Sequence, residues 1–137
     1  MRVDERPERR LLDVTIEVAG DRVTIVAPRG ELDVDTAAQL RATIDGLLAR
    51  GTTRIVVDLS GLGFCDSVGL STFTVASAAC ARAGGYLRLA APTAFLARLL
   101  DVVGLLQRLP VYATVDAARH GDTAGLVPPP DPGPQRP

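Results

Sequence analysis

The hydrophobic positions along the chain alternate between a strand period and a helical period. Apolar side chains occupy every second position over Leu12–Val18 and again over Val23–Ala27, which predicts two strands, the first with one buried face. Because the turn signal Gly20-Asp21 separates the two segments, we expect an antiparallel hairpin. A nearly continuous apolar run, Ile55–Leu59, predicts a central strand that is covered on both faces.

The rest of the chain alternates helices with short strands. Apolar residues three and four positions apart predict helices over residues 36–50, 71–83 and 92–104. Further strands are expected over residues 86–90 and 109–113. The expected buried face of the second helix consists of Leu70, Phe73, Ala76, Ala79 or Cys80, and Ala83. The expected buried face of the third helix consists of Phe95, Leu99, Val102 and Val103.

Polar and glycine-rich segments mark the expected connections. Thr36 followed by Gln39 is a capping-box signature and predicts that the first helix begins at Thr36. We expect an acid-rich loop over residues 30–35 and a turn over residues 61–63. Residues 115–119 predict a weak terminal turn.

The resulting order, β-β-α-β-α-β-α-β, predicts a single α/β domain over residues 11–119. About five strands would form a mixed sheet flanked by helices. We expect a flexible lead-in over residues 1–10. Because residues 120–137 are rich in Pro and Gly and poor in apolar side chains, that segment is expected to be a disordered tail.

Composition narrows the classes of function. A net charge of −1 argues against non-specific nucleic-acid binding, which requires a basic surface. No apolar run approaches the ~20 residues of a membrane-spanning helix. The charged start, residues 1–10, has no apolar segment typical of a secretory signal, so a cytoplasmic protein is expected. Cys65 and Cys80 fit no metal spacing and are predicted to be small buried hydrophobes.

Catalytic arrangements are poorly supported by the sequence. The only histidine, His120, falls at the edge of the expected tail, so Ser67 has no predicted base, and we expect no enzymatic activity and no cofactor. A metal-dependent hydrolase is the alternative, but solvated carboxylates are the commoner explanation of such acids and no metal site is predicted. The acids that could gather at one end of the sheet are Glu31, Asp33, Asp35, Asp58 and Asp66.

Ser67 lies where a strand is followed by a helix, near backbone N–H groups that have no partner within the helix. Two interpretations remain open for this hydroxyl: Asp66-Ser67 is a good helix cap, or Ser67 is a regulatory site. Gly69 costs a helix roughly 1 kcal/mol relative to Ala, so its small size is needed either for packing on the sheet or for the approach of a partner.

Four motifs together resemble the STAS family, and most closely the bacterial anti-sigma factor antagonists. These motifs run in register from Leu12 to Ala118, and each is weak alone. They are Gly30-Glu31-Leu32-Asp33, Thr36-Ala37 with Leu40, Val57-Asp58-Leu59-Ser60, and Phe64-x-Asp66-Ser67-x-Gly69-Leu70.

The resemblance implies a small α/β domain that switches between protein partners. In that family the serine after the aspartate, here Ser67, is phosphorylated by an anti-sigma factor that is also a serine kinase. The unphosphorylated antagonist binds the anti-sigma factor and frees the sigma factor, and a serine phosphatase restores binding. The partner-binding residues implied for this chain are Glu31, Asp33, Asp66, Ser67, Val68, Gly69 and Leu70.

Two departures from the family pattern bear on these expectations. Val68 stands where a second serine is common, so Ser67 is the single candidate acceptor, and Ser71 replaces a common glycine. The same resemblance also fits a STAS module of another assembly, such as a stress-signalling complex or a lipid-transport system. The intact Asp-Ser-x-Gly motif and the free-standing domain favour the antagonist.

Overall fold

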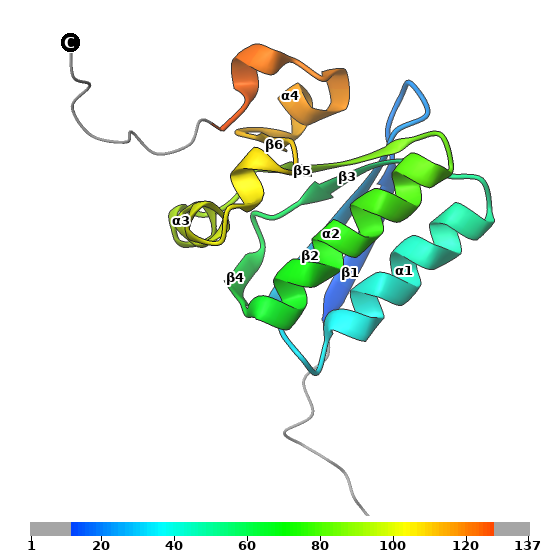
Figure 1. Cartoon of the computed structure of the whole chain (residues 1–137). Helices are drawn as coiled ribbons and strands as arrows, with labels where there is room; N and C mark the ends of the chain where they lie inside the picture. Colours follow the sequence, from blue (N-terminus) through cyan, green and yellow to red (C-terminus); the bar gives the residue numbers. More distant parts are fainter. Residues whose placement is uncertain (1–11, 128–137) are drawn as a thin grey trace, which may run out of the picture.

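The computed structural model describes residues 12–127, so the expected lead-in and residues 128–137 of the expected tail lie outside the described residues. The described chain forms six strands, four helices and two short 3-10 helices (Figure 1). In chain order they are β1 (Asp13–Val18), β2 (Thr24–Leu32), α1 (Ala37–Ala49), β3 (Arg54–Asp58), β4 (Leu62–Cys65), α2 (Ser67–Arg82), β5 (Tyr86–Ala90), α3 (Ala94–Val102), η1 (Leu105–Gln107), β6 (Val111–Tyr112), α4 (Val115–His120) and η2 (Thr123–Gly125).

The strands form one mixed sheet in the order β1-β2-β3-β5-β6, with β4 paired to the end of β2. The predicted hairpin is confirmed: β1 and β2 are antiparallel, and the other neighbours are parallel. The predicted α/β domain with a mixed sheet flanked by helices is therefore confirmed, with six strands in place of about five.

The additional strand, β4, arises because β2 is longer than expected and changes partner along its length. Thr24–Val26 pair with β3, whereas Gly30–Leu32 pair with β4, and this second pairing contains a register shift between Gly30 and Glu31. The expected turn at residues 61–63 holds only for Gly61, because β4 begins at Leu62, and the first three residues of the expected loop at 30–35 are wrong. Neither short segment shows a strand pattern alone, because each becomes a strand through pairing with the other.

The sheet separates two hydrophobic clusters. Helices α1, α2 and α3 pack on one face, where the larger cluster includes Leu40, Phe73 and Leu100, and α4 packs on the opposite face through Ala118 (Figure 1). The central strand β3 alternates between the two clusters, so the prediction that it is covered on both faces is confirmed.

The buried faces of three elements differ from their predicted faces. In α3, the buried residues are Leu96 and Leu100, whereas three of the predicted residues are exposed: Phe95, Val102 and Val103. Ala83 follows the last residue of α2 and is exposed, while the buried set of Leu70, Phe73, Ala76 and Cys80 is confirmed. In β1, Ile16 and Val18 are exposed because the strand forms the edge of the sheet, beyond the cover of α1.

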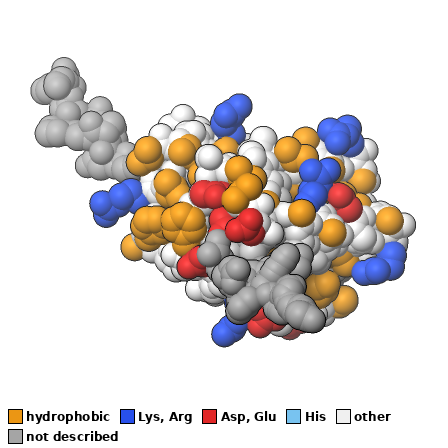
Figure 2. Space-filling model, turned by 90° about the horizontal axis from the view of Figure 1, so that it is seen from below, with side chains coloured by type: hydrophobic (Ala, Val, Ile, Leu, Met, Phe, Trp, Pro, Cys, Tyr) orange, Lys and Arg blue, Asp and Glu red, His pale blue; other side chains and the backbone are white. Residues whose placement is uncertain are grey.

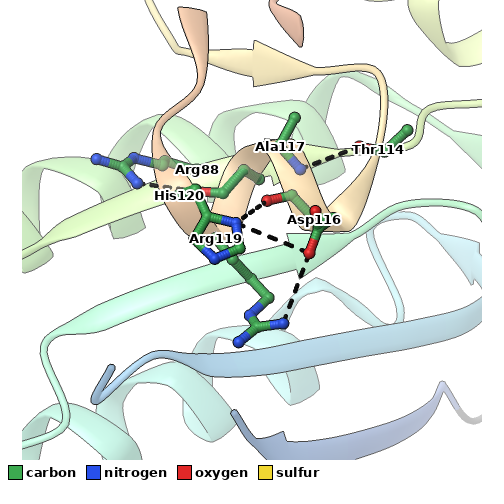
Figure 3. A network of polar contacts seen from close by, with 7 residues as sticks. Arg88, Thr114, Asp116, Ala117, Arg119 and His120 are labelled. Atoms are coloured by element: carbon green, nitrogen blue, oxygen red, sulfur yellow. Dashed lines mark hydrogen bonds and ion pairs between the residues drawn. The ribbon is translucent and has the colours of Figure 1, made fainter. Parts of the chain in front are cut away.

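The expected tail begins too early. His120 is the last residue of α4, and its Nδ1 lies 2.9 Å from the carbonyl oxygen of Asp116 (Figure 3). The backbone then forms η2, and Leu126 makes a β-bridge with Tyr112. Residues 120–127 are therefore folded onto the domain, because α4 and β6 provide partners that composition does not show.

Arg88 attaches α4 to the sheet. Its guanidinium lies 3.7 Å from the centre of the Tyr86 ring, and Nη1 donates a hydrogen bond of 2.9 Å to the carbonyl oxygen of Ala118. The Arg88 side chain thus stacks on an aromatic ring of β5 and donates a hydrogen bond to a carbonyl oxygen of α4.

We predict that Arg88→Met lowers the free energy of unfolding by about 1–3 kcal/mol, because it removes the charged hydrogen bond and the cation–π contact but keeps the aliphatic stem. Urea denaturation followed by circular dichroism measures the change. Arg98→Met, at an exposed position of α3, is the matched control and should leave stability unchanged. Equal effects of the two variants would contradict the role of Arg88.

Candidate functional site

The connection between β2 and α1 is organised by two buried polar residues, Asp33 and Thr36. Oδ1 of Asp33 accepts hydrogen bonds from the backbone N–H groups of Asp35 (2.9 Å) and Thr36 (3.2 Å). The Thr36 hydroxyl accepts from the Asp33 N–H at 3.0 Å and donates to the Glu31 carbonyl at 2.7 Å. The loop is therefore held in place by its own hydrogen bonds, and the buried Asp33 carboxylate stabilises the loop.

The predicted capping box does not form. Thr36 occupies the N-cap position of α1, but its side chain makes no cap hydrogen bond to the helix. Oε1 of Gln39 instead accepts from the backbone N–H of Leu12 at 2.9 Å. The local signature is overridden because Asp33 and the start of β1 offer better-placed partners for these two side chains.

Asp66 joins this loop to the start of α2. Its Oδ1 accepts from the Gly69 N–H at 2.8 Å and so caps the helix, while Oδ2 accepts from the Val34 N–H at 3.1 Å. The Asp66 N–H in turn donates to the Leu32 carbonyl oxygen at 3.1 Å. One aspartate thereby holds the end of β2, the loop before α1 and the first turn of α2 together.

Ser67 is the first residue of α2 and is exposed to solvent. Because the side chain of Asp66 already caps the helix, the Ser67 hydroxyl is not needed as a cap. Within residues 12–127 this hydroxyl has no hydrogen-bonding partner. The structure thus separates two roles that the sequence left together: Asp66 caps, and Ser67 presents a hydroxyl to solvent.

Gly69 and Leu70 face the core. A Cβ atom added to Gly69 would lie 2.5 Å from the carbonyl oxygen of Leu32 and 2.9 Å from Sγ of Cys65. Leu70 is 5% exposed and belongs to the larger hydrophobic cluster. Of the two interpretations of Gly69, close packing on the sheet is therefore the one that the geometry supports.

Exposed apolar side chains lie on the elements that meet near Ser67, and we call this set of residues the Ser67 surface. It combines residues from the loop before α1, from β4, from the first turn of α2 and from the end of α3: Val34, Phe64, Val68, Val102 and Val103. Each of these side chains is at least 42% exposed. A groove of about 200 Å³ opens within this surface, lined by Ser67, Leu70, Ser71, Thr74, Val103 and Leu105.

Acidic side chains lie next to this apolar surface. Glu31 is exposed on β2, directly across from Phe64 of β4, and Asp35 is exposed in the loop before α1. Figure 2 shows acidic side chains gathered near the centre of this end of the molecule, with hydrophobic side chains beside them. Sequence reasoning missed Val34, Val102 and Val103 as site residues, because only the fold brings α3 beside β4 and the loop before α1 beside Asp66.

Cys65 lies beneath the site as a neutral thiol. Burial raises the pKa of the Cys65 thiol to about 12, and the nearby carboxylates of Asp66 and Asp33 add to the rise. Burial likewise raises the pKa of Cys80 to about 11. Both thiols are protonated at neutral pH, and the prediction that they are small buried hydrophobes is confirmed.

The five acids considered for a metal site do not assemble into one. Across the described part of the chain, no group of three or more His, Cys, Asp and Glu side chains could hold a metal ion. Asp33 is buried in its loop, and Asp58 accepts hydrogen bonds from the backbone and hydroxyl of Ser60. In the same described range, no helix combines the length and the apolar character needed to cross a bilayer.

The fold and this site define a STAS domain. A family model described as the Mlab, STAS domain matches residues 14–111, more than half of the chain, and the protein belongs to this family. The chain is 28% identical to the anti-sigma-F factor antagonist RsfB of Mycobacterium tuberculosis over 115 residues, which cover 83% of this chain and 93% of that protein. The resemblance that the motifs indicated is thereby confirmed.

Solved structures agree with this assignment. A crystal structure of an anti-sigma factor antagonist from Mycobacterium paratuberculosis is similar with a TM-score of 0.72 and 28% identity, covering 80% of this chain and 92% of that one. The phosphorylated form of the Bacillus cell fate determinant SpoIIAA shares the fold, with a TM-score of 0.61, 23% identity and coverage of 80% and 98%.

We predict that Gly69→Ala lowers the free energy of unfolding by about 1–3 kcal/mol, because the new methyl group meets the backbone of β2 and forces α2 away from the sheet. Chemical denaturation measures the loss. Gly46→Ala in α1 is the matched control: its added Cβ meets nothing within 4 Å. That control should stabilise the protein by up to about 1 kcal/mol through helix propensity, and a neutral Gly69→Ala would show that the contact is not tight.

Proposed function

We propose that this protein is an anti-sigma factor antagonist that is switched by phosphorylation of Ser67. In the unphosphorylated state it binds an anti-sigma factor that is also a serine kinase, and so releases a sigma factor. A serine phosphatase that acts on phosphorylated Ser67 restores the binding state. The names of the similar mycobacterial proteins support this role, and SpoIIAA, which shares the fold, exists in a phosphorylated form.

The observation that carries the proposal is the exposed and unbonded hydroxyl of Ser67 beside a helix cap that Asp66 already supplies. A hydroxyl that stabilised the fold would resist modification, because its hydrogen bond would have to break. Ser67 can instead enter the active site of a kinase while α2 stays capped. In this cycle the hydroxyl is a substrate, and the protein itself catalyses nothing.

A phosphate on Ser67 would change the surface more than the fold. It adds a charge of about −1.5 to −2 at a helix N-terminus, where the helix dipole favours an anion. The new charge would lie in the Ser67 surface, near Glu31, Asp35 and Asp66. A partner that fits this surface when it is neutral would then meet charge and bulk, and would lose affinity through desolvation and repulsion.

The chemistry of the Ser67 surface indicates what the partner presents. Exposed valine and phenylalanine side chains around a shallow groove suit an apolar helix or loop, and the adjacent acids suit basic residues at its rim. The partner contacts proposed from the sequence divide accordingly. Glu31, Ser67 and Val68 would touch the partner, whereas Asp33, Asp66, Gly69 and Leu70 hold the surface in place.

The proposed cycle takes place in the cytoplasm, where sigma factors act. A STAS module of another assembly remains the alternative, and it differs in a measurable way. In a binding assay, an antagonist should bind an anti-sigma factor and release the sigma factor from it. A module of a stress-signalling or lipid-transport complex should do neither.

We predict that Ser67→Glu weakens binding to the cognate anti-sigma factor by on the order of 100-fold, because a carboxylate mimics part of the phosphate charge. Isothermal titration calorimetry against the anti-sigma factors of the source organism measures the affinity. Ser67→Ala is the control: it should bind as wild type does and should no longer be phosphorylated by the kinase. If Ser67→Glu bound as tightly as wild type, the switch would be wrong.

We also predict that Val103→Asp weakens the same binding by roughly tenfold or more, because it places a charge in the apolar groove beside Ser67. The variant should fold normally, since Val103 is 45% exposed. Ala49→Asp is the matched control, with the same charge at the exposed end of α1 away from Ser67. Unchanged affinity for Val103→Asp would remove α3 from the proposed interface.

A further inference from the structure

The outer edge of β1 is not part of the surface that the proposed switch uses. Within residues 12–127, β1 lies at the end of the sheet order and pairs with β2 alone (Figure 1). Ile16 is 47% exposed and Val18 is 78% exposed. The strand sequence, Asp-Val-Thr-Ile-Glu-Val, contains neither Pro nor Lys, the residues that commonly block the pairing of edge strands.

The hydrogen-bond pattern shows which backbone groups face that edge. At the hairpin turn the N–H of Ala19 donates to the carbonyl oxygen of Val23 at 2.8 Å. Hydrogen-bonded pairs alternate along an antiparallel ladder, so Asp13, Thr15 and Glu17 bond to β2. The N–H and C=O groups of Val14, Ile16 and Val18 therefore point away from the sheet.

At the N-terminal end of β1, a side chain occupies the outward backbone N–H group. The N–H of Leu12, two residues before Val14, is bound by Oε1 of Gln39. The open section is thus Val14–Val18, and its central residue is Ile16. These five residues are long enough to form an antiparallel pair with the same five residues of a second copy of the chain.

We propose that two copies of this chain associate by pairing their β1 strands antiparallel, with Ile16 opposite Ile16 of the second copy. The sheets of the two copies then become one continuous sheet across a two-fold axis. In this register Val14 lies opposite Val18, and the outward N–H and C=O groups of all three residues pair across the axis. The exposed apolar side chains of both copies cover one another.

Charge selects this register over its neighbours. If the axis passed through Thr15, Asp13 would lie directly opposite Glu17 of the second copy, twice. If the axis passed through Glu17, the two Glu17 carboxylates would face each other. With the axis at Ile16, Glu17 lies opposite Thr15, and no carboxylate directly opposes another. Like charges directly across a strand pair destabilise it, so the Ile16-centred register is favoured.

This association is independent of the proposed switch. It uses the outer edge of β1, whereas the Ser67 surface uses the loop before α1, β4, the first turn of α2 and the end of α3. A dimer built in this way would therefore carry two copies of the Ser67 surface.

Sedimentation velocity of the full chain over a range of concentrations tests the proposal. Wild type should show a reversible monomer–dimer equilibrium, and Ile16→Lys should raise the dissociation constant at least tenfold. Val75→Lys, at a 42% exposed position of α2 outside the Ser67 surface, is the matched control and should dimerise as wild type does. Circular dichroism establishes that each variant is folded, and Val18→Lys provides a second variant should Ile16→Lys unfold.

Thr15→Arg tests the register itself. In the Ile16-centred pair it places an arginine opposite Glu17 of the second copy on both sides of the axis, so it should tighten the dimer at low salt. In the Thr15-centred pair it would place two arginines opposite each other and weaken the dimer. A monomeric wild type at every concentration, or a dimer that Ile16→Lys leaves intact, overturns the proposal, and weaker association of Thr15→Arg overturns the register.

Discussion

The two-sided binding of the Asp66 carboxylate is the interaction on which the rest of the site depends. One oxygen caps α2 through the Gly69 N–H, and the other holds the Val34 N–H of the loop before α1. A helix start and a loop 32 residues earlier in the chain are thereby placed by one side chain. Asp66 is half-buried, and the two backbone N–H groups provide one hydrogen-bond donor for each of its carboxylate oxygens.

Because Asp66 caps α2, the Ser67 hydroxyl is not needed to stabilise the helix start. Asp66 caps the helix, Gly69 allows α2 to approach the backbone of Leu32, and the hydroxyl between them points to solvent. A modification site of a reversible switch has to be accessible to two enzymes and must not unfold the domain in either state. Both requirements are met because the two roles fall to adjacent residues: Asp66 stabilises the helix start, and Ser67 carries the hydroxyl that would be modified.

Much of the fold followed from periodicity, and the misses share a cause. The hairpin, the central strand and the buried face of α2 were predicted, because each is set by a pattern within one segment. The strand β4, the buried face of α3 and the partners of Thr36 and Gln39 were not. Each of these depends on a second segment: β2 makes a strand of residues 62–65, the core at Leu96 and Leu100 orients α3, and Asp33 engages Thr36. The folding of residues 120–127 onto β6 belongs to the same group.

The class of the domain, its family and the position of Ser67 at a helix start can be predicted from the sequence, since they rest on periodicity and on motifs within short stretches. The role of each motif residue depends on how distant segments pack in the folded domain. This packing buries Asp33, Gly69 and Leu70, leaves Glu31, Ser67 and Val68 at the surface, and brings Val103 to the groove that Ser67 lines. The physical reason is that exposure is not a property of a residue or of its neighbours in the chain. It is set by which distant segment covers the residue, and that is known only once β2, β4, α2 and α3 have packed together.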